Sequence, residues 1–202
     1  MNVALLKYNA GNIQSVIFAL NRLGIEPNLT DNPDEILSAD KVIFPGVGEA
    51  SSSMQSLKSS KLDIIIPKLK QPVLGICVGL QLMCNHSEEG NTTGLGIFDI
   101  HVKKFKSGVS DASGMLKIPQ MGWNTISNLK GKLYDGIKEN SYIYYVHSYY
   151  AEYSDKYTVA VTDYTLPYSA SLQKDNFYAV QFHTEKSSKV GAQILENFIR
   201  IE

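Results

Sequence analysis

The sequence is short of cysteine, and this shortage limits what could hold the fold together. Its 202 residues include only two cysteines, Cys77 and Cys84, which is too few for a disulfide framework. The two lie seven positions apart near one predicted helix, so their side chains would be two turns apart and beyond the reach of a disulfide. We therefore expect two free thiols, with Cys84 packed in the core.

The sequence also has no excess of positive or negative charge and no long run of apolar residues. The formal net charge is −1 at pH 7 and the two signs are mixed along the chain, which argues against a nucleic-acid-binding protein. Apolar stretches such as 62–67 are far too short to span a membrane. The first residues have neither the basic region nor the cleavage site of a secretory signal. We expect a cytoplasmic protein that binds neither nucleic acid nor a membrane.

Patterns typical of metal and nucleotide sites are absent as well. Cys77, Cys84 and His86 do not have the spacing of a zinc site. The glycine-rich segment 45–48 is not followed by the Lys-Ser/Thr of a P-loop and does not match a dinucleotide fingerprint. We expect no metal and no cofactor, and phosphate binding at this segment is the less favoured alternative.

The composition that is present, 44% hydrophobic and 19% charged, is typical of a globular protein and suffices for one domain over residues 1–202. In the first half, short apolar runs alternate with segments whose apolar residues recur every three or four positions. We predict strands at 1–7, 26–30, 41–44 and 73–76, and helices at 13–24, 49–57, 62–69 and 80–85, with a short helix ending at residue 37. This alternation favours an α/β fold with a flavodoxin-like, doubly wound, mostly parallel central sheet and helices on both faces.

After Phe98 the pattern changes to alternating polar and apolar residues. Further strands are predicted around 100–105, 123–126, 142–145, 157–162, 169–173 and 178–182. A last amphipathic helix over 186–201 should pack back on the sheet. We therefore expect an additional antiparallel β section in the C-terminal half of the same domain.

Cys77 lies where the predicted strand 73–76 passes directly into a helix. Gly75 and Gly79 stand two residues before and two residues after it, as suits a sharp nucleophile elbow with little room for side chains. The helix N-terminus at such a turn favours the thiolate, the form of cysteine that attacks a carbonyl carbon. A buried residue that serves only for packing is the alternative for a lone cysteine.

A cysteine nucleophile needs a base and a group that orients this base. His183 follows the apolar run 178–182, and in an extended segment Glu185 would project to the same side and could orient the imidazole. This pair is therefore the leading candidate. The remaining histidines are less informative: surface positions are expected for His86 and His101, and His147 is open between packing and a place in the site.

The tetrahedral intermediate of an acyl transfer also needs hydrogen-bond donors for its oxyanion. The backbone N–H of Val78, directly after the nucleophile, is one candidate donor. The glycines of the segment 46–48 would let a second backbone N–H turn toward the site. The oxyanion hole is therefore predicted from these residues: Gly46, Val47, Gly48 and Val78.

Three motifs in order along the chain carry a family resemblance. They are Pro45-Gly46-Val47-Gly48, Gly75-Ile76-Cys77-Val78-Gly79-Leu80-Gln81 and Gln181-Phe182-His183-Thr184-Glu185. Their combination resembles the triad-type class I glutamine amidotransferases. Within that family the sequence is most similar to the glutaminase subunits of imidazole glycerol phosphate synthases, through segments 11–16, 87–90, 119–124 and 146–149.

The resemblance implies that the chain hydrolyses glutamine to glutamate and ammonia through a cysteine thioester. Cys77 would attack the side-chain amide, His183 would protonate the departing ammonia and activate water, and Glu185 would orient His183. By the same resemblance, the residues that hold the amino-acid end of glutamine are Gln81, Glu89, Ser148 and Tyr149.

The resemblance also implies a heterodimer with a (β/α)8-barrel cyclase subunit, which uses the ammonia to make imidazole glycerol phosphate and AICAR in histidine biosynthesis. The chain ends at Glu202 soon after the last predicted helix, so we expect this acceptor to be a separate subunit. Activity should be low without it, because docking would complete the oxyanion hole. The residues implied to face it are Asn12, Gln120, Met121, Trp123, Tyr144 and Lys186.

One departure from the family leaves the acceptor open. The family usually has Asp-Tyr-Gly where this chain has Lys7-Tyr8-Asn9, a charge reversal close to the expected partner face. The alternative is therefore a paralogous subunit that supplies a different synthase, for example one that aminates a sugar. The glutaminase of pyridoxal phosphate synthesis is disfavoured, because it has Gly-Gly-Glu-Ser at the position of segment 46–49. The second alternative is a non-catalytic scaffold of the same fold.

Overall fold

A seven-stranded sheet forms the centre of the computed structural model, which describes residues 1–8, 12–46, 48–111 and 114–202. Five neighbouring strands of this sheet are parallel: β15 (Phe177–Val180), β4 (Val73–Ile76), β3 (Lys41–Phe44), β1 (Val3–Leu6) and β2 (Asn28–Thr30). Beyond β15 the sheet continues with two antiparallel strands, β14 (Pro167–Lys174) and β13 (Thr158–Asp163).

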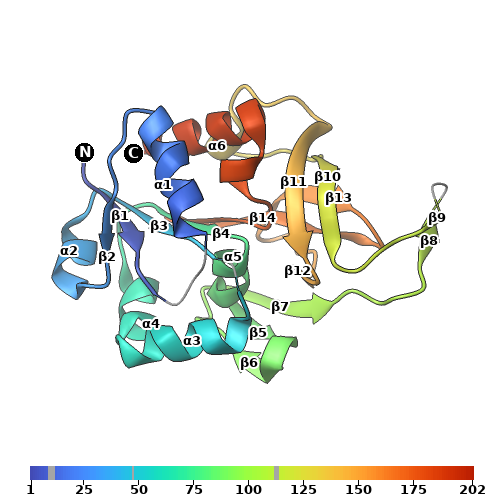
Figure 1. The fold of residues 1–202 in the computed structure, drawn as a ribbon, viewed down its shortest axis with the longest axis horizontal. Coiled ribbons are helices and arrows are strands. Elements are labelled where there is room, and N and C mark those ends of the chain that lie inside the picture. The colour runs from blue at the N-terminus through green and yellow to red at the C-terminus, as the bar shows by residue number, and fades with distance from the viewer. Residues whose placement is uncertain (9–11, 47, 112–113) are drawn as a thin grey trace.

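Helices cover both faces of this sheet (Figure 1). On one side lie α1 (Ile13–Arg22) and α6 (Ser188–Arg200), and on the other lie α3 (Ala50–Ser59) and α4 (Leu62–Ile65). The short helix α2 (Pro33–Ser38) begins where the Asn32 side chain accepts a hydrogen bond from the Asp34 N–H, and α5 (Val78–Met83) follows β4 directly. The predicted doubly wound α/β fold is confirmed.

The antiparallel β section is also confirmed. Beside the central sheet, β10 (Gln120–Ile126) and β11 (Ser141–His147) form an antiparallel pair. The hairpin of β8 (Ser110–Asp111) and β9 (Gly114–Met115) projects from the body of the molecule (Figure 1).

A second, four-stranded sheet corrects one boundary. The helix predicted over 80–85 ends at Met83, and Cys84–Ser87 forms strand β5 instead. This strand pairs with β6 (Thr92–Thr93) and with β7 (Phe98–Lys104), which in turn pairs with β12 (Tyr149–Ala151). Pairing on both edges supplies hydrogen bonds that local sequence could not reveal, so tertiary contacts override the helical pattern here.

The core consists of apolar side chains from the strands and the inward faces of the helices. Every residue of β1, β3, β4 and β15 is buried. Both cysteines are free thiols, and Cys84 is fully buried, as predicted. None of the helices in the described ranges is long and apolar enough to cross a membrane.

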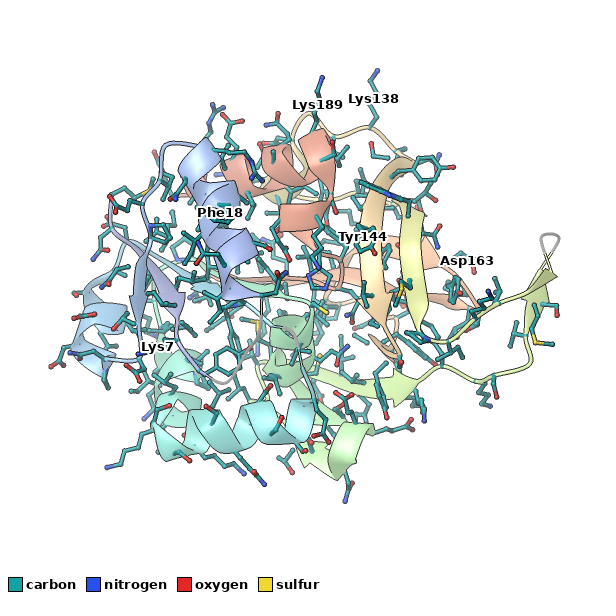
Figure 2. All side chains as sticks on the ribbon, in the orientation of Figure 1. Lys7, Phe18, Lys138, Tyr144, Asp163 and Lys189 are labelled. Atoms are coloured by element: carbon teal, nitrogen blue, oxygen red, sulfur yellow. The ribbon has the colours of Figure 1, made fainter. Side chains whose placement is uncertain are left out.

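Two phenylalanines on the helices of one face differ sharply in burial and test this core. Phe198 of α6 is 0% exposed and packs against Tyr178, whereas Phe18 of α1 is 54% exposed (Figure 2). Phe198→Ala should lower the free energy of unfolding by about 3–5 kcal/mol because it leaves a cavity. Phe18→Ala should change it by no more than about 0.5 kcal/mol. Chemical denaturation of both variants measures the difference, and equal effects would contradict this packing of α6.

Candidate active site

Cys77 occupies a strained turn between β4 and α5. Its backbone has φ 53° and ψ −107°, a conformation that residues with a side chain rarely adopt. The Cys77 N–H donates a 2.8 Å hydrogen bond to the carbonyl of Val180 at the end of β15. This turn has the strand-to-helix form of a nucleophile elbow, and the Cys77 side chain is buried within it.

The glycines around the elbow allow β3 to pack directly onto it. A Cβ atom at Gly79 would lie 2.3 Å from the Phe44 carbonyl oxygen, and one at Gly46 would lie 2.5 Å from the Gly79 nitrogen. Neither position has room for a side chain. The end of β3 is thereby held against the start of α5, next to the candidate nucleophile Cys77.

His183 and Glu185 form a buried pair, as predicted, but not through an extended segment. His183 Nδ1 donates to Glu185 Oε1 at 2.8 Å, and the two side chains are 3% and 2% exposed. Residues Thr184–Lys186 form a 3-10 turn rather than a strand, and this turn folds the carboxylate back onto the imidazole. Because Nδ1 is occupied by Glu185, Nε2 is the ring nitrogen left to interact with Cys77.

The electrostatics of the pair favour a protonated His183. Burial by itself lowers the pKa of this imidazole, but the Cys77 charge, a hydrogen bond with Cys77 and the Glu185 carboxylate raise it to about 10. This raised pKa contributes folding stability in full below the ordinary histidine pKa of 6.5, and the contribution is lost as the pH rises through about 10.

Asn12 contacts this pair from the start of α1. Its Nδ2 donates to Glu185 Oε1 at 3.1 Å, and its own Oδ1 accepts a 2.5 Å hydrogen bond from Ser15 Oγ. Asn12 was expected to face a partner, yet its half-buried side chain is directed at Glu185. The role of Asn12 as a second support of the carboxylate was not apparent from the sequence, because the two residues are far apart along the chain.

A cavity of about 330 Å³ opens at the elbow. Its wall includes the candidate nucleophile, the candidate base and all four residues that were predicted to hold substrate. The lining residues predicted from the sequence are Cys77, Val78, Gly48, His183, Gln81, Glu89, Ser148, Tyr149 and Lys186. Gly46 is buried behind the wall, and Val47 lies outside the described residues.

Glu89 provides an acidic group at this cavity. Its Oε2 accepts a 2.8 Å hydrogen bond from the Ala50 N–H. Partial burial raises the pKa of the carboxyl, the Ala50 hydrogen bond opposes this, and the charge of Glu49 raises it further. The cavity therefore combines the candidate nucleophile Cys77, the candidate base His183 and a carboxyl group.

Two glutamine side chains link Cys77 to the cavity wall. Gln81 Nε2 donates to the Tyr149 carbonyl at 3.0 Å and to Gln181 Oε1 at 3.2 Å. Gln181 Nε2 in turn donates to Cys77 Sγ at 3.7 Å. Gln181 was missing from the predicted site, although a polar residue after the apolar strand β15 could have indicated it.

Some of the residues expected to face a partner are exposed and one is buried, depending on which side of a strand they occupy. Met121 and Trp123 on β10 are 65% and 52% exposed, and Trp123 packs edge-to-face on the partly buried Tyr144 of β11 (Figure 2). Lys186 is exposed at the cavity. The expectation that Gln120 faces the partner is wrong, because its side chain is buried at 2% exposed. Alternate residues of a strand face opposite sides, so Gln120 points away from the face of Met121 and Trp123.

The other histidines are also placed. His147 lies in the cavity wall, and burial, supported by the charge of His183 and opposed by a hydrogen bond to Tyr149, lowers its pKa to about 4. His86 and His101 lie side by side on β5 and β7, with ring centroids 5.9 Å apart. Among the described residues, no group of three or more histidine, cysteine, aspartate or glutamate side chains could hold a metal ion.

The charge interaction between Cys77 and His183 predicts a measurable change in titration. In Cys77→Ala the pKa of His183 should fall well below about 10, because burial continues to disfavour the imidazolium while the Cys77 charge is gone. A pH titration of the His183 ring by NMR measures this, and the ring signals of His86 and His101 serve as a control for folding. An unchanged titration of His183 would contradict the interaction.

The chain is similar to known proteins over nearly its whole length. Residues 4–201 match the family model "Glutamine amidotransferase class-I". The imidazole glycerol phosphate synthase subunit HisH of Bacteroides fragilis (strain YCH46) is 54% identical over 201 residues, covering 100% of both chains. The subunit of the same name in Escherichia coli (strain K12) is 42% identical over 203 residues, again covering 100% of both.

Solved structures agree in fold. A crystal structure of a glutamine amidotransferase has a TM-score of 0.74 at 15% identity, over 98% of this chain and 97% of the other. A glutamine amidotransferase from Thermotoga maritima has a TM-score of 0.61 at 15% identity, over 98% and 82%. From the family match and the full-length relatives, the chain belongs to the class I glutamine amidotransferases.

Proposed function

We propose that this chain is the glutaminase subunit of an imidazole glycerol phosphate synthase and delivers ammonia to a separate (β/α)8-barrel cyclase subunit. The observation that carries the proposal is the cavity in which the Cys77 elbow meets the buried His183–Glu185 pair. The names of the relatives in B. fragilis and E. coli, which match over the whole chain, support this choice of synthase.

The chemistry proceeds in two steps. The Cys77 thiolate attacks the side-chain amide carbon of glutamine, and the C–N bond breaks as the His183 imidazolium delivers its Nε2 proton to the leaving nitrogen. Water then attacks the thioester while His183 takes a proton from it, which releases glutamate and restores the thiolate. Glu185 accepts the Nδ1–H throughout and so keeps Nε2 directed at the reacting atoms.

Backbone N–H groups stabilise the oxyanion that forms in both steps. The N–H of Val78 follows the nucleophile directly, and Gly48 lines the same cavity with a φ of 128°. Gly46 is held against α5 and anchors the segment. Val47 belongs to this proposed hole by its sequence position. Docking of the cyclase subunit completes the hole and couples glutamine hydrolysis to ammonia use.

The rest of the cavity holds the amino-acid end of glutamine. The Glu89 carboxylate lies in the wall and binds the substrate ammonium group. Ser148 and Tyr149 also line the cavity and hold the substrate carboxylate, and Gln81 donates a hydrogen bond to the Tyr149 carbonyl. Lys186 also lines the cavity, and we place it on the side from which ammonia would pass to the cyclase subunit.

Replacement of the nucleophile tests the proposal directly. Cys77→Ala should reduce glutamine-dependent synthesis by the assembled synthase by more than about 1000-fold, because no thioester can form. Synthesis from added ammonia should remain at the wild-type rate, because the cyclase reaction does not use this site.

Cys84→Ala is the matched control, since Cys84 is fully buried away from the cavity. This variant should keep glutamine-dependent synthesis. Residual glutaminase turnover in Cys77→Ala would disprove the role of the nucleophile. Wild-type protein that supports no glutamine-dependent synthesis with a histidine-pathway cyclase would disprove the choice of partner.

The exposed aromatic on β10 tests the proposed docking face. Large aromatic side chains at the centre of an interface contribute most of its binding energy, and Trp123 is 52% exposed in this chain. Trp123→Ala should raise the Kd for the cyclase subunit by about 10- to 100-fold, measured by calorimetry. Tyr153→Ala is the control, because Tyr153 is similarly exposed at 50% but lies outside the predicted face. Equal affinities of the two variants would exclude Trp123 from the interface.

A further inference from the structure

His147 is a buried histidine in the cavity wall that the proposed reaction does not use. Its Nδ1 lies 2.8 Å from the Tyr149 carbonyl oxygen, which can only accept a hydrogen bond. The proton of the neutral ring is therefore on Nδ1, and Nε2 is left as an acceptor. The lowered pKa of His147 agrees with a neutral ring.

Tyr168 of β14 supplies the group that faces this acceptor. Its hydroxyl lies 3.2 Å from His147 Nε2 and 2.9 Å from Gln120 Oε1, and its side chain is 0% exposed. Burial raises the pKa of Tyr168 well above that of an ordinary tyrosine, so the hydroxyl keeps its proton. One proton cannot serve both acceptors at once.

Gln120 resolves this competition. Its Nε2 is buried and has no hydrogen-bond partner, while its Oε1 faces the Tyr168 hydroxyl. The two ends of a glutamine amide are assigned from such networks. When the Gln120 amide is flipped so that Oε1 and Nε2 exchange places, Nε2 donates a hydrogen bond to the Tyr168 hydroxyl oxygen. The Tyr168 hydroxyl then donates to His147 Nε2. The hydrogen bonds then all run in the same direction, from Gln120 through Tyr168 and His147 to the Tyr149 carbonyl. The buried Nε2 of Gln120 also gains a partner.

We propose that Gln120 and Tyr168 are positioning residues of the active site, which act through His147 on the Tyr149 carbonyl to hold the substrate-facing wall of the cavity. The hydrogen bonds run from β10 through β14 and β11 to the wall. At the Tyr149 carbonyl they meet the hydrogen bond from Gln81, which continues through Gln181 to Cys77 Sγ.

The strands involved explain why this wall needs such support. Val146, His147, Ser148 and Tyr149 all line the cavity where β11 passes into β12. The Tyr149 carbonyl therefore has two buried donors, the His147 ring and the Gln81 amide. Loss of one donor leaves the segment that contacts substrate less strictly held.

The state of His147 can be tested without any assay of activity. In Tyr168→Phe the aromatic ring of residue 168 still packs against His147 and Phe105. His147 Nε2, however, loses the hydroxyl that donates to it. The ¹⁵N resonance of His147 Nε2 should shift downfield, toward that of an imine nitrogen without a hydrogen bond. Gln120→Met should shift it in the same direction by a smaller amount. Tyr178→Phe removes a hydroxyl from a buried tyrosine on β15 and is the control.

The effect on function rests on the proposed glutaminase role and is measured with the cyclase subunit present. Tyr168→Phe should raise the KM for glutamine by about 2- to 10-fold, the equivalent of one hydrogen bond, with kcat little changed. A variant that is only less stable would lower kcat through loss of active protein and leave KM unchanged.

The two measurements separate the possible failures. An Nε2 resonance that moves no more in Tyr168→Phe than in Tyr178→Phe overturns the hydrogen-bond chain, whatever the kinetics show. A shifted resonance with an unchanged KM overturns its role in positioning the wall. If wild-type protein with the cyclase subunit hydrolyses no glutamine, the proposed function fails, whereas the resonance still decides whether the chain of hydrogen bonds exists.

Discussion

The strained turn at Cys77 is the constraint on which the rest of the site depends. A cysteine with φ 53° is held there because its N–H bonds to the end of β15, while β3 packs against Gly79 from the other side. The carboxyl ends of the neighbouring parallel strands β15, β4 and β3 therefore lie next to one another. The candidate nucleophile Cys77 comes directly after β4, the candidate base His183 after β15 and the glycine segment after β3. Any side chain at Gly79 would push β3 away and separate these parts.

Burial of an ion pair beside the thiol is the second requirement. Charges removed from water are costly unless they are paired and hydrogen-bonded, and here the His183 ring is held between Cys77 and Glu185, with Asn12 bonded to the same carboxylate oxygen. The other carboxylate oxygen of Glu185 is buried without a partner among the described residues. These buried charges raise the pKa of the imidazole and favour its protonated form beside Cys77, the form that the proposed acid step uses.

Strand β11 connects the proposed site to the proposed docking face. The Tyr144 carbonyl accepts a hydrogen bond from the His183 N–H, the Val146 carbonyl lies 3.9 Å from Cys77 Sγ, and His147 lines the cavity. Its partner β10 carries Met121 and Trp123 on the outer face and Gln120 on the inner face. A protein that docks on β10 therefore rests on a two-stranded ribbon whose other strand contacts the His183 backbone and the Cys77 side chain.

Local pattern was enough to predict the alternating strands and helices up to Cys77, the elbow there and the candidate base His183, because glycine spacing, strand ends and apolar periodicity are properties of neighbouring residues. The strand at Cys84–Ser87 was missed because its hydrogen bonds come from β6 and β7. The contact of His183 with Glu185 was predicted for the wrong reason, since a 3-10 turn makes it. Gln181, Asn12 and the inward side of Gln120 were decided only by tertiary structure, because each depends on an atom supplied by a distant segment.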